Sequence, residues 1–537
     1  MSTASELLRL GKTEDTWQKY CGFLDLSIKE FMDIQRHLLT EQLELLSDCE
    51  LGRKVMGRAR PRTVEEFRQK APFTTYEAYA PYLLERREDV LPEKPMFWQR
   101  TSGRSGEYRF KWVPVTERLY NEIGLYIVSW VIFASCTERG DIKYRDKDKL
   151  LYGMAPPPYP SGALARALHR ELVLDVFPPM GEAEVMAFRQ RMEEGFRTAL
   201  SEGMDYQFGL ASVLVSIGEQ ISQGMLGGTS LSFSQLRTPS QFKAIPRLAR
   251  GLVKAKLARR PLLPKDLWKL KGLASGGSDS AVFRERIKYY WGRYPLESYG
   301  CAEAGLIAMQ TWDYKDMTPL PTLSFLEFMP EEECLKLRQD PSYQPRTVLL
   351  NEVEAGQRYE VVFTSFHGCP FIRYRVGDMI QVNALRNEQL NINLPQIGFY
   401  ARSDDIIDIG GFTRLTERVI GQAIENSGLA YAGWTARKEI VGDEPVLHLY
   451  IELKDYQGTF SDARYAIHRS LKELDLDYAA LEDMLHFEPL RMTLLPEGAF
   501  PRYMLEQVAA GAEVAHLKPL QINAPDEVVE RLLRTEE

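Results

Sequence analysis

CPFIRYRVGD, residues Cys369 to Asp378, is the segment from which the fold of this 537-residue chain is assigned. Its residues predict a β-strand that ends at Gly377 and Asp378. An acidic residue after a strand is well placed to bind both hydroxyls of a ribose, as dinucleotide-binding folds do. A Gly–Asp pair is equally typical of a surface turn. The segment alone therefore leaves two alternatives, a nucleotide contact at Asp378 or an ordinary turn.

A glycine-rich segment, TSGRSGE from Thr101 to Glu107, lies between two stretches of strand character within residues 96–115. Glycines let backbone amides approach a phosphate closely, and the hydroxyls of Ser and Thr add hydrogen-bond donors. The segment is not a Walker loop, because no lysine follows in the required register. A phosphate-binding loop and a simple Ser/Gly turn are the two alternatives.

A third segment, SYGCAEAG from Ser298 to Gly305, places an aromatic and an acidic residue four positions apart at the end of an apolar strand. Tyr299 can stack on a purine there, and Glu303 can bind Mg²⁺ through one carboxylate. The alternative is structural: Tyr299 packs in the core and Glu303 caps a helix.

Taken together, the three segments resemble the adenylate-forming superfamily that includes 4-coumarate–CoA ligase and firefly luciferase. They are more similar still to the Gretchen Hagen acyl acid–amido synthetases, known from plant auxin and jasmonate conjugation. Members of that family carry a Ser/Thr-Gly-Thr-Ser phosphate loop, then a Tyr…Ser-Glu motif, then Tyr-Arg-Val-Gly-Asp. The matching residues of this chain, in the same order, are Thr101 to Ser105, Tyr299 to Glu303 and Tyr374 to Asp378.

The resemblance covers most of the chain, residues 70–520. TTYEAYAPYL, which begins at Thr74, resembles a Thr-Tyr-Glu…Pro-Tyr segment of the family. FLEFMPEEE and YEVVFTSFHG resemble two of its strands. PEGAFPRYMLEQVAAGAEVAHLKPLQI resembles the family's ending and aligns Lys518 with its tail lysine. Arg414 stands near the position of another lysine, which approaches the adenylate in plant members.

The resemblance implies a reaction in which ATP converts a carboxylic acid into an acyl-adenylate and the acyl group then moves to an acceptor. Such a site must hold two anions within attack distance, so positioning and charge neutralisation are the main catalytic needs. The implied cofactors are ATP and Mg²⁺, with Lys518 and Glu303 as catalytic residues and Glu303 also as metal ligand. The implied contacts to ATP or AMP are Ser102, Gly103 and Ser105 at the phosphates, Gly277 and Ser278 along the adenine or acyl phosphate, Tyr299 beside the adenine, Asp378 at the ribose, Arg402 at the ribose or phosphate, and Arg414 near the adenylate.

Three alternatives remain for the function of the chain. An amino acid amine would give an amide, and the HLKPL ending favours this reaction. The thiol of CoA or of a carrier protein would give a thioester, and CPFIRYRVGD is also similar to phenylacetate–CoA ligases. A non-catalytic binding protein on the same fold is the third alternative, and the retained Glu303, Asp378 and Lys518 argue against it.

A basic segment extends from Arg237 to Lys271. It holds eleven Lys or Arg residues and a single acidic residue, Asp266. This composition predicts an anion-binding surface, which would suit the phosphates of CoA, or simply the solvated face of a helix.

Residue patterns divide the chain into a large front part and a smaller tail. Apolar residues at helical spacing predict two or three helices over residues 13–70, and residues 117–270 are expected to be largely helical. The expected fold is α/β: a large N-terminal adenylate-forming domain, residues 1–407, with mixed β-sheets between helices, and a small mobile α+β domain, residues 413–537. The tail is predicted to contain helices at Leu415–Ser427 and Asp462–Leu474, a hairpin at Glu439–Leu453 and a strand at Leu485–Leu494.

Composition describes an ordinary globular protein. Hydrophobic residues make up 44% and charged residues 26%, and the formal net charge of −8 gives no general attraction to nucleic acid or to an anionic membrane. The six cysteines show no metal-binding or redox spacing. The longest apolar run, Gly124 to Cys136, is too short to span a membrane and predicts a buried helix. No signal peptide opens the chain, so a cytoplasmic location is expected. No exposed heptad appears, so a monomer is expected, with small-molecule partners and no nucleic acid or membrane partner.

Overall fold

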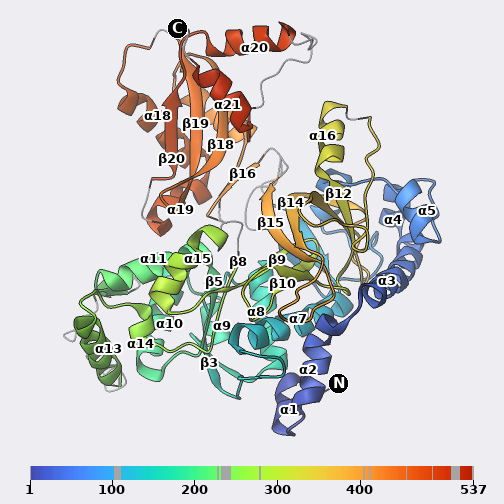
Figure 1. Ribbon diagram of the computed structural model, residues 1–537, viewed down its shortest axis with the longest axis vertical. Helices are drawn as coiled ribbons and strands as arrows, with labels where there is room; N and C mark the ends of the chain where they lie inside the picture. Colours follow the sequence, from blue (N-terminus) through green and yellow to red (C-terminus); the bar gives the residue numbers. More distant parts are fainter. Residues whose placement is uncertain are drawn as a thin grey trace. The chain divides into compact units, whose positions relative to one another are not determined.

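A computed structural model gives the structure of the protein (Figure 1). Contacts within the chain define two compact units. The first consists of the described residues within 1–101, 111–276 and 284–403, and the second consists mainly of the described residues from Ile406 onward. In the part of the chain that the structure describes, no helix is long and apolar enough to cross a membrane. The described residues are 2–101, 110–226, 229–230, 243–276, 280–340, 342–402, 406–410, 413–454, 456–485, 488–509 and 521–534.

The first unit begins with a series of helices, several of which start at capping residues. Thr3 and Ser27 each form a capping box with a Glu three positions later, which satisfies amides that the helix leaves unpaired. Cys49 has extended backbone, ends the long helix α3 and caps the next helix with its sulfur. Residues 13–70 therefore form four α-helices rather than the predicted two or three. The elements are α1 (Ala4–Arg9), α2 (Thr13–Cys21), η1 (Gly22–Asp25), α3 (Ile28–Asp48), α4 (Glu50–Met56), α5 (Val64–Lys70), η2 (Tyr76–Ala78) and α6 (Ala80–Leu83).

An eleven-stranded sheet forms the centre of the first unit and is parallel at one end and antiparallel at the other. Strands β4, β3, β5, β8 and β9 are parallel neighbours in that order. Strands β10, β11, β15, β14, β13 and β12 then continue the sheet with antiparallel pairing. The mixed sheet and its helices confirm the expected α/β class. The strands are β3 (Asp148–Leu151), β4 (Leu174–Phe177), β5 (Tyr206–Leu210), β8 (Gly272–Gly276), β9 (Leu296–Cys301), β10 (Gly305–Gln310), β11 (Met317–Pro319), β12 (Ser324–Pro330), β13 (Arg358–Ser365), β14 (Tyr374–Ala384) and β15 (Gln396–Arg402).

The prediction that residues 117–270 are largely helical is wrong for three strands of this sheet, β3, β4 and β5. Each has only four or five residues, none of them exposed, and each lies among helices in the sequence. Four or five residues are too few to establish a period, so the sequence pattern does not distinguish such a strand from a piece of helix. A small pair, β6 (Met225–Leu226) and β7 (Thr229–Ser230), lies in the same region. The helices of the region and those that come after it are α7 (Glu117–Ser135), α8 (Pro160–Glu171), α9 (Met180–Ala183), α10 (Phe188–Glu202), α11 (Ala211–Ser222), α13 (Ile245–Leu257), α14 (Pro264–Leu267), α15 (Ser280–Trp291) and α16 (Glu331–Gln339).

The apolar run that ends at Cys136 is the buried helix α7, as predicted. Trp130 of this helix stacks on Phe208 of β5, with 5.2 Å between ring centroids. Gly272 of β8 allows a close approach, since a Cβ at this position would lie 3.2 Å from the Cβ of Ala134 and 2.6 Å from the ring of Tyr206. The helix therefore packs directly on the parallel part of the sheet.

The CPFIRYRVGD segment enters a strand, but the prediction that this strand ends at the Gly–Asp pair is wrong. β14 continues past Asp378 to Ala384. Next to it, Val362 of β13 faces Arg375, whereas Glu360 faces Met379, so β14 carries extra residues between these two pairs. Gly377 lies in this bulge with φ +77°, a conformation that glycine adopts without strain. A bulge within the strand, and not a strand end, explains the Gly–Asp pair.

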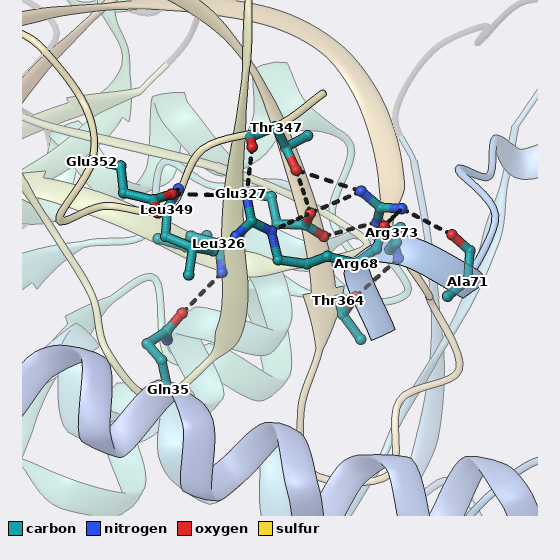
Figure 2. Close-up of polar contacts among 10 residues, drawn as sticks. All are labelled: Gln35, Arg68, Ala71, Leu326, Glu327, Thr347, Leu349, Glu352, Thr364 and Arg373. Atoms are coloured by element: carbon teal, nitrogen blue, oxygen red, sulfur yellow. Dashed lines mark hydrogen bonds and ion pairs between the residues drawn. The ribbon is translucent and has the colours of Figure 1, made fainter. Parts of the chain in front are cut away.

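A buried ion-pair cluster anchors Arg373, just before this strand (Figure 2). The backbone of Arg373 has φ +39°, in the left-handed region. Its guanidinium donates two hydrogen bonds to Glu327 of β12, at 3.0 and 2.9 Å. Nη1 also donates to the carbonyl oxygens of Arg68 and Ala71, at 2.8 and 2.9 Å, and Thr347 donates to Glu327 at 2.6 Å. The cluster ties the helical N-terminal residues to the antiparallel part of the sheet.

The second unit is an α+β structure with a three-stranded sheet. β18 pairs antiparallel with β19, which pairs parallel with β20. α17 and α18 contribute apolar residues to a core with this sheet, and residues of α20 and α21 form a second cluster with Tyr450 of β19. The two predicted helices are confirmed with shifts of at most two residues at their bounds. The predicted hairpin is confirmed as well, but its first strand begins at Tyr431, eight residues before the predicted Glu439. The strand predicted from Leu485 begins only at Leu490, because α19 ends at Leu485. The elements are β16 (Ile406–Ile409), β17 (Thr413–Thr416), α17 (Glu417–Asn426), β18 (Tyr431–Val441), β19 (Glu444–Leu453), α18 (Phe460–Leu474), α19 (Leu476–Leu485), β20 (Leu490–Leu494), α20 (Ala499–Ala509) and α21 (Asp526–Leu533).

Candidate functional site

The glycine-rich segment connects two antiparallel strands, as predicted. β1 (Phe97–Arg100) pairs with β2 (Trp112–Val115). Thr101 and Lys111 extend the pairing by one step: the Thr101 amide donates to the Lys111 carbonyl, and the Lys111 amide donates to Oγ1 of Thr101, both at 3.0 Å. These two residues therefore form the base of the loop. The predicted phosphate contacts Ser102, Gly103 and Ser105 lie outside the described residues.

Glu303 lies in the tight turn between β9 and β10, in which Cys301 pairs with Gly305. The turn depends on glycine at two positions. A Cβ at Gly300 would lie 2.1 Å from the carbonyl oxygen of Gly305, and Gly305 itself has φ +73°. The hydroxyl of Ser365 on β13 donates to the Glu303 carbonyl at 2.9 Å and fixes the turn to the sheet. Glu303 therefore does not cap a helix; the sequence places it in a rigid, buried hairpin turn.

The carboxylate of Glu303 meets residues from the two other motifs. Nζ of Lys111 lies 2.9 Å from Oε1 of Glu303 and 2.7 Å from the hydroxyl of Tyr374, which itself donates to Oε1 of Glu303 at 2.8 Å. Burial works to raise the pKa of Glu303, but the Lys111 charge and these hydrogen bonds outweigh it and hold the pKa below its ordinary value. Burial and the neighbouring Glu303 raise the pKa of Tyr374 well above its usual range. An ionised carboxylate, an ammonium group and a protonated phenol thus share one buried site.

A second polar group forms around Asp378. The hydroxyl of Tyr299 donates to Oδ2 of Asp378 at 3.1 Å, and Nη1 of Arg402 lies 3.0 Å from Oδ1. Arg402 faces Asp378 across the β14–β15 ladder, and its Nη2 donates to the Val376 carbonyl at 3.2 Å. Burial, followed by the Asp378 charge, raises the pKa of Tyr299 well above its usual range, so its hydroxyl remains a donor. Tyr299 is also packed near Phe399, with 6.1 Å between centroids, and therefore combines its core-packing role with a polar one.

The TTYEAYAPYL segment supports both the third motif and the loop base. The Thr74 amide donates to the Arg373 carbonyl at 3.0 Å, and the Arg375 amide donates to the Thr74 carbonyl at 2.9 Å. The hydroxyl of Tyr76 exchanges hydrogen bonds with the backbone of Trp112, the residue after Lys111, at 2.9 and 3.0 Å. This segment therefore fixes the distance between Lys111 and β14.

Three of the other residues that the sequence singled out lie outside the described residues: Gly277, Ser278 and Lys518. Arg414 is described, and its Nε lies 3.2 Å from Oδ2 of Asp408, its partner across the β16–β17 hairpin of the second unit. The structure thus brings together Tyr299, Glu303, Asp378 and Arg402 within the first unit, while Arg414 belongs to a separate hairpin.

Sequence reasoning missed Lys111. Its signal was weak but real: it is the first lysine after the glycine-rich loop and directly precedes the strand β2. A cation at the foot of a phosphate loop is chemically expected, since phosphate charge must be neutralised. Tyr374 was identified only as part of a motif, and its hydrogen bond to Glu303 joins residues 71 positions apart, which no local pattern reveals.

A further carboxyl, Glu297 on β9, lies two residues before Tyr299. Burial raises its pKa to about 7, against the attraction of Arg284. Its buried Oε1 has no hydrogen-bond partner among the described residues, which agrees with a neutral carboxyl.

Glu297 is expected to make the folded protein less stable as the pH rises. The unfolded chain ionises this group near its ordinary value of 4.5, whereas the folded chain does so only near 7. The stabilising contribution is therefore complete below pH 4.5 and is lost as the pH rises to about 7. Glu297→Gln should remove this loss. Its effect on the free energy of unfolding should be more favourable at pH 8 than at low pH, by roughly 3 kcal/mol. Urea unfolding of the wild type and of this variant at acidic and alkaline pH measures the difference. Glu332→Gln, a change at an exposed residue, is the control and should show the wild-type pH dependence.

Two family models match the chain. The model described as GH3 family N-terminal domain matches residues 21–169, and the model described as GH3 family central domain matches residues 317–402. The first match contains Lys111 and the glycine-rich loop, and the second contains Arg373, Asp378 and Arg402.

Similar curated proteins are amido synthetases of plants. The indole-3-acetic acid-amido synthetase GH3.3 of Arabidopsis thaliana is 25% identical over 259 residues, which cover 44% of this chain and 41% of that protein. The jasmonoyl–L-amino acid synthetase GH3.5 of Oryza sativa subsp. japonica is 24% identical over 291 residues, which cover 49% of this chain and 47% of that protein. The chain thus spans less than half the length of these two relatives.

Among solved structures, a 2-hydroxyisobutyryl-CoA ligase in complex with 2-HIB-AMP and CoA is similar to this chain over 96% of this chain and 93% of that one. The TM-score is 0.55 and the sequence identity is 13%. At this identity the likeness concerns the fold.

Proposed function

We propose that the chain is a member of the GH3 family and an ATP-dependent ligase, because the models of the family's N-terminal and central domains match residues 21–169 and 317–402. It activates a carboxylic acid as an acyl-adenylate and transfers the acyl group to the amine of an amino acid, forming an amide. The convergence of three distant motifs carries this proposal: Lys111 at the loop base and Tyr374 of the third motif both contact Glu303 of the second.

The chemistry explains what such a site must do. A carboxylate is a poor electrophile, because a nucleophile would have to add to an anion. In the first step a carboxylate oxygen attacks the α-phosphorus of ATP, and the bond to the bridging oxygen breaks, so that pyrophosphate leaves with the electron pair. In the second step the amine nitrogen attacks the acyl carbon, AMP leaves with the electron pair of the acyl–oxygen bond, and the nitrogen loses a proton. Alignment of anions and neutralisation of their charge dominate both steps.

The described residues provide suitable groups for these tasks. Lys111 offers a compact positive charge at the foot of the loop, where the triphosphate would lie. Asp378, held between Tyr299 and Arg402, would accept hydrogen bonds from the ribose hydroxyls, and Tyr299 would lie beside the adenine. A carboxylate can accept further hydrogen bonds beside those two contacts. The rigid setting of both clusters would let the site meet the nucleotide without reorganisation.

Glu303 fits the role of Mg²⁺ ligand. Its pKa lies below the ordinary value, so the carboxyl is ionised at neutral pH. Among the described residues, its side-chain contacts with Lys111 and Tyr374 both use Oε1. Magnesium is usually held by one or two carboxylates together with substrate phosphates, and when bound it would neutralise part of the phosphate charge.

The remaining assignments come from the family. Ser102, Gly103 and Ser105 would contact the phosphates, Gly277 and Ser278 the adenine or acyl phosphate, Arg414 the adenylate and Lys518 the reaction centre. We further propose an adenylate-forming domain of residues 1–407, a C-terminal domain of residues 413–537 and a cytoplasmic, monomeric enzyme.

Acid-dependent release of pyrophosphate tests the activation step. The protein is incubated with ATP, Mg²⁺ and one member of a panel of aryl, indole and fatty acids, with hydroxylamine as the trap for an acyl-adenylate. We expect pyrophosphate and the matching hydroxamate with one or a few acids. Pyrophosphate release that is independent of any acid, or a folded protein that does not bind ATP, would contradict the proposal.

The acceptor is tested separately, with the acid identified in this way. Mass spectrometry of the products formed with a panel of amino acids, and with CoA, distinguishes an amide from a thioester. An amide with at least one amino acid is expected. A CoA thioester without any amide would overturn the acceptor while leaving the activation step intact.

A further inference from the structure

Helix α13 lies at the periphery of the first unit and presents an unusual outer face (Figure 1). Its inner face holds the buried residues Leu248, Gly251 and Ala255, which are three and four positions apart. A Cβ at Gly251 would lie 2.9 Å from a methyl group of Leu267 and 3.0 Å from one of Leu262, so the helix sits tightly on its support. The opposite side of the helix is therefore exposed to the solvent.

Large apolar side chains form the centre of that outer side. Val253 is 58% exposed and Leu257 is 80% exposed. Because they are four residues apart, both point away from the inner face that Leu248, Gly251 and Ala255 define. The neighbouring Leu252 is exposed as well. Exposed apolar side chains on the outer face of a helix lack the favourable free energy that burial away from water would give.

Basic side chains flank this apolar line on both sides. Lys256 lies on one side of it, and Arg250 and Lys254 lie on the other, all three exposed. In the described part of the chain no carboxylate forms an ion pair with any of these three. The nearest acidic residue in the sequence, Asp266, is buried and bound by Arg260 at 2.6 Å. The outer face is therefore strongly positive although the whole chain carries a formal charge of −8.

We propose that α13 docks on an anionic lipid surface. Val253 and Leu257 enter the boundary between headgroups and acyl chains, and Arg250, Lys254 and Lys256 bind lipid phosphates on either side. An apolar line flanked by long cationic side chains is the pattern of helices that lie in a membrane interface, where the cations extend back to the headgroups. A free phosphate or a CoA phosphate would use the cations but would leave the apolar line unexplained. The expectation that the chain has no membrane contact rested on its net charge, which this local patch opposes.

Vesicle flotation of the full chain tests the proposal. Vesicles of equal parts phosphatidylcholine and phosphatidylglycerol should carry the protein, and vesicles of phosphatidylcholine alone should carry it about tenfold less. The double variant Val253→Glu, Leu257→Glu should lose binding about tenfold or more, and so should the triple variant Arg250→Gln, Lys254→Gln, Lys256→Gln. Val185→Glu is the matched control, because Val185 is 86% exposed but lies outside α13; it should bind as the wild type does.

Each other outcome overturns the proposal. Wild-type protein that does not float with anionic vesicles shows no lipid docking. Loss in the triple variant with full binding in the double variant shows that the cations recognise phosphate without insertion of the apolar line. Equal losses in Val185→Glu show an effect of surface charge in general. Binding of inorganic phosphate that competes fully with vesicles points to a soluble anion as the ligand. All variants change exposed side chains, and circular dichroism confirms that each remains folded.

Discussion

Glu303→Gln is expected to lower kcat/KM for acyl-adenylate formation by about 10²–10³-fold. Glutamine keeps the shape of the side chain and can still accept the hydrogen bond from Tyr374, but it removes the negative charge that faces Lys111 and that would hold Mg²⁺. The carboxylate is ionised in the folded protein, since its pKa lies below the ordinary value, so the loss of charge is complete at neutral pH. Initial rates of hydroxamate formation measure the effect.

The matched control is Glu297→Gln, the same substitution on the adjoining strand β9. Glu297 makes no contact with Lys111 or Tyr374 among the described residues, and this variant should keep the wild-type rate. A Glu303→Gln enzyme with wild-type kcat/KM over a range of Mg²⁺ concentrations would contradict the assigned role. Because this change leaves Lys111 without its counter-charge, thermal unfolding should be compared as well, and Glu303→Gln combined with Lys111→Met restores a neutral pair.

Glu327→Ala is expected to destabilise the first unit by about 3–5 kcal/mol. Glu327 is fully buried and accepts two of the hydrogen bonds that the Arg373 guanidinium donates, so its removal leaves that buried charge without its carboxylate partner. The change also frees the backbone of Arg373, whose left-handed conformation the cluster holds. Since most tryptophans lie in the first unit, urea unfolding followed by tryptophan fluorescence reports the loss.

An exposed ion pair provides the control for this prediction. Nη1 of Arg358 lies 3.6 Å from Oε1 of Glu331 at the start of α16, and the two side chains are 38% and 47% exposed. Glu331→Ala should therefore cost about 1 kcal/mol or less. Glu327→Leu combined with Arg373→Met should be less destabilising than Glu327→Ala, because both charges are then absent. Equal urea midpoints for Glu327→Ala and the wild type would show that the cluster does not stabilise the fold.

Much of the candidate site could be predicted from the sequence, because its parts are carried by short local motifs. The strand–loop–strand unit around Thr101, the acidic residue Glu303 at the end of a strand and the acidic residue Asp378 are each recognisable from glycine and polar residues in a short stretch. Their order along the chain matches that of a known family, and the fold class followed from this resemblance. The motifs did not reveal the contact that joins them, since Lys111 and Glu303 are 192 positions apart.

The parts that were not predicted share a physical cause. The parallel strands β3, β4 and β5 have only four or five residues each, too few to show the alternation that identifies longer strands. The bulge at Gly377 is visible only in the register of β14 against β13, and no local pattern separates it from a turn. The pair of Arg373 and Glu327 joins residues 46 positions apart through tertiary packing alone.

Acid-dependent exchange of labelled pyrophosphate into ATP is the most direct test of the account. The exchange needs no acceptor, so it isolates the reversible formation of the acyl-adenylate from the transfer step. With the acid that yields a hydroxamate, the label should enter ATP only when both that acid and Mg²⁺ are present, and Asp378→Asn should reduce the exchange about 10²-fold or more. Exchange in the absence of acid, or undiminished exchange in the Asp378→Asn and Glu303→Gln proteins, would contradict the assignment of this site to acyl-adenylate formation.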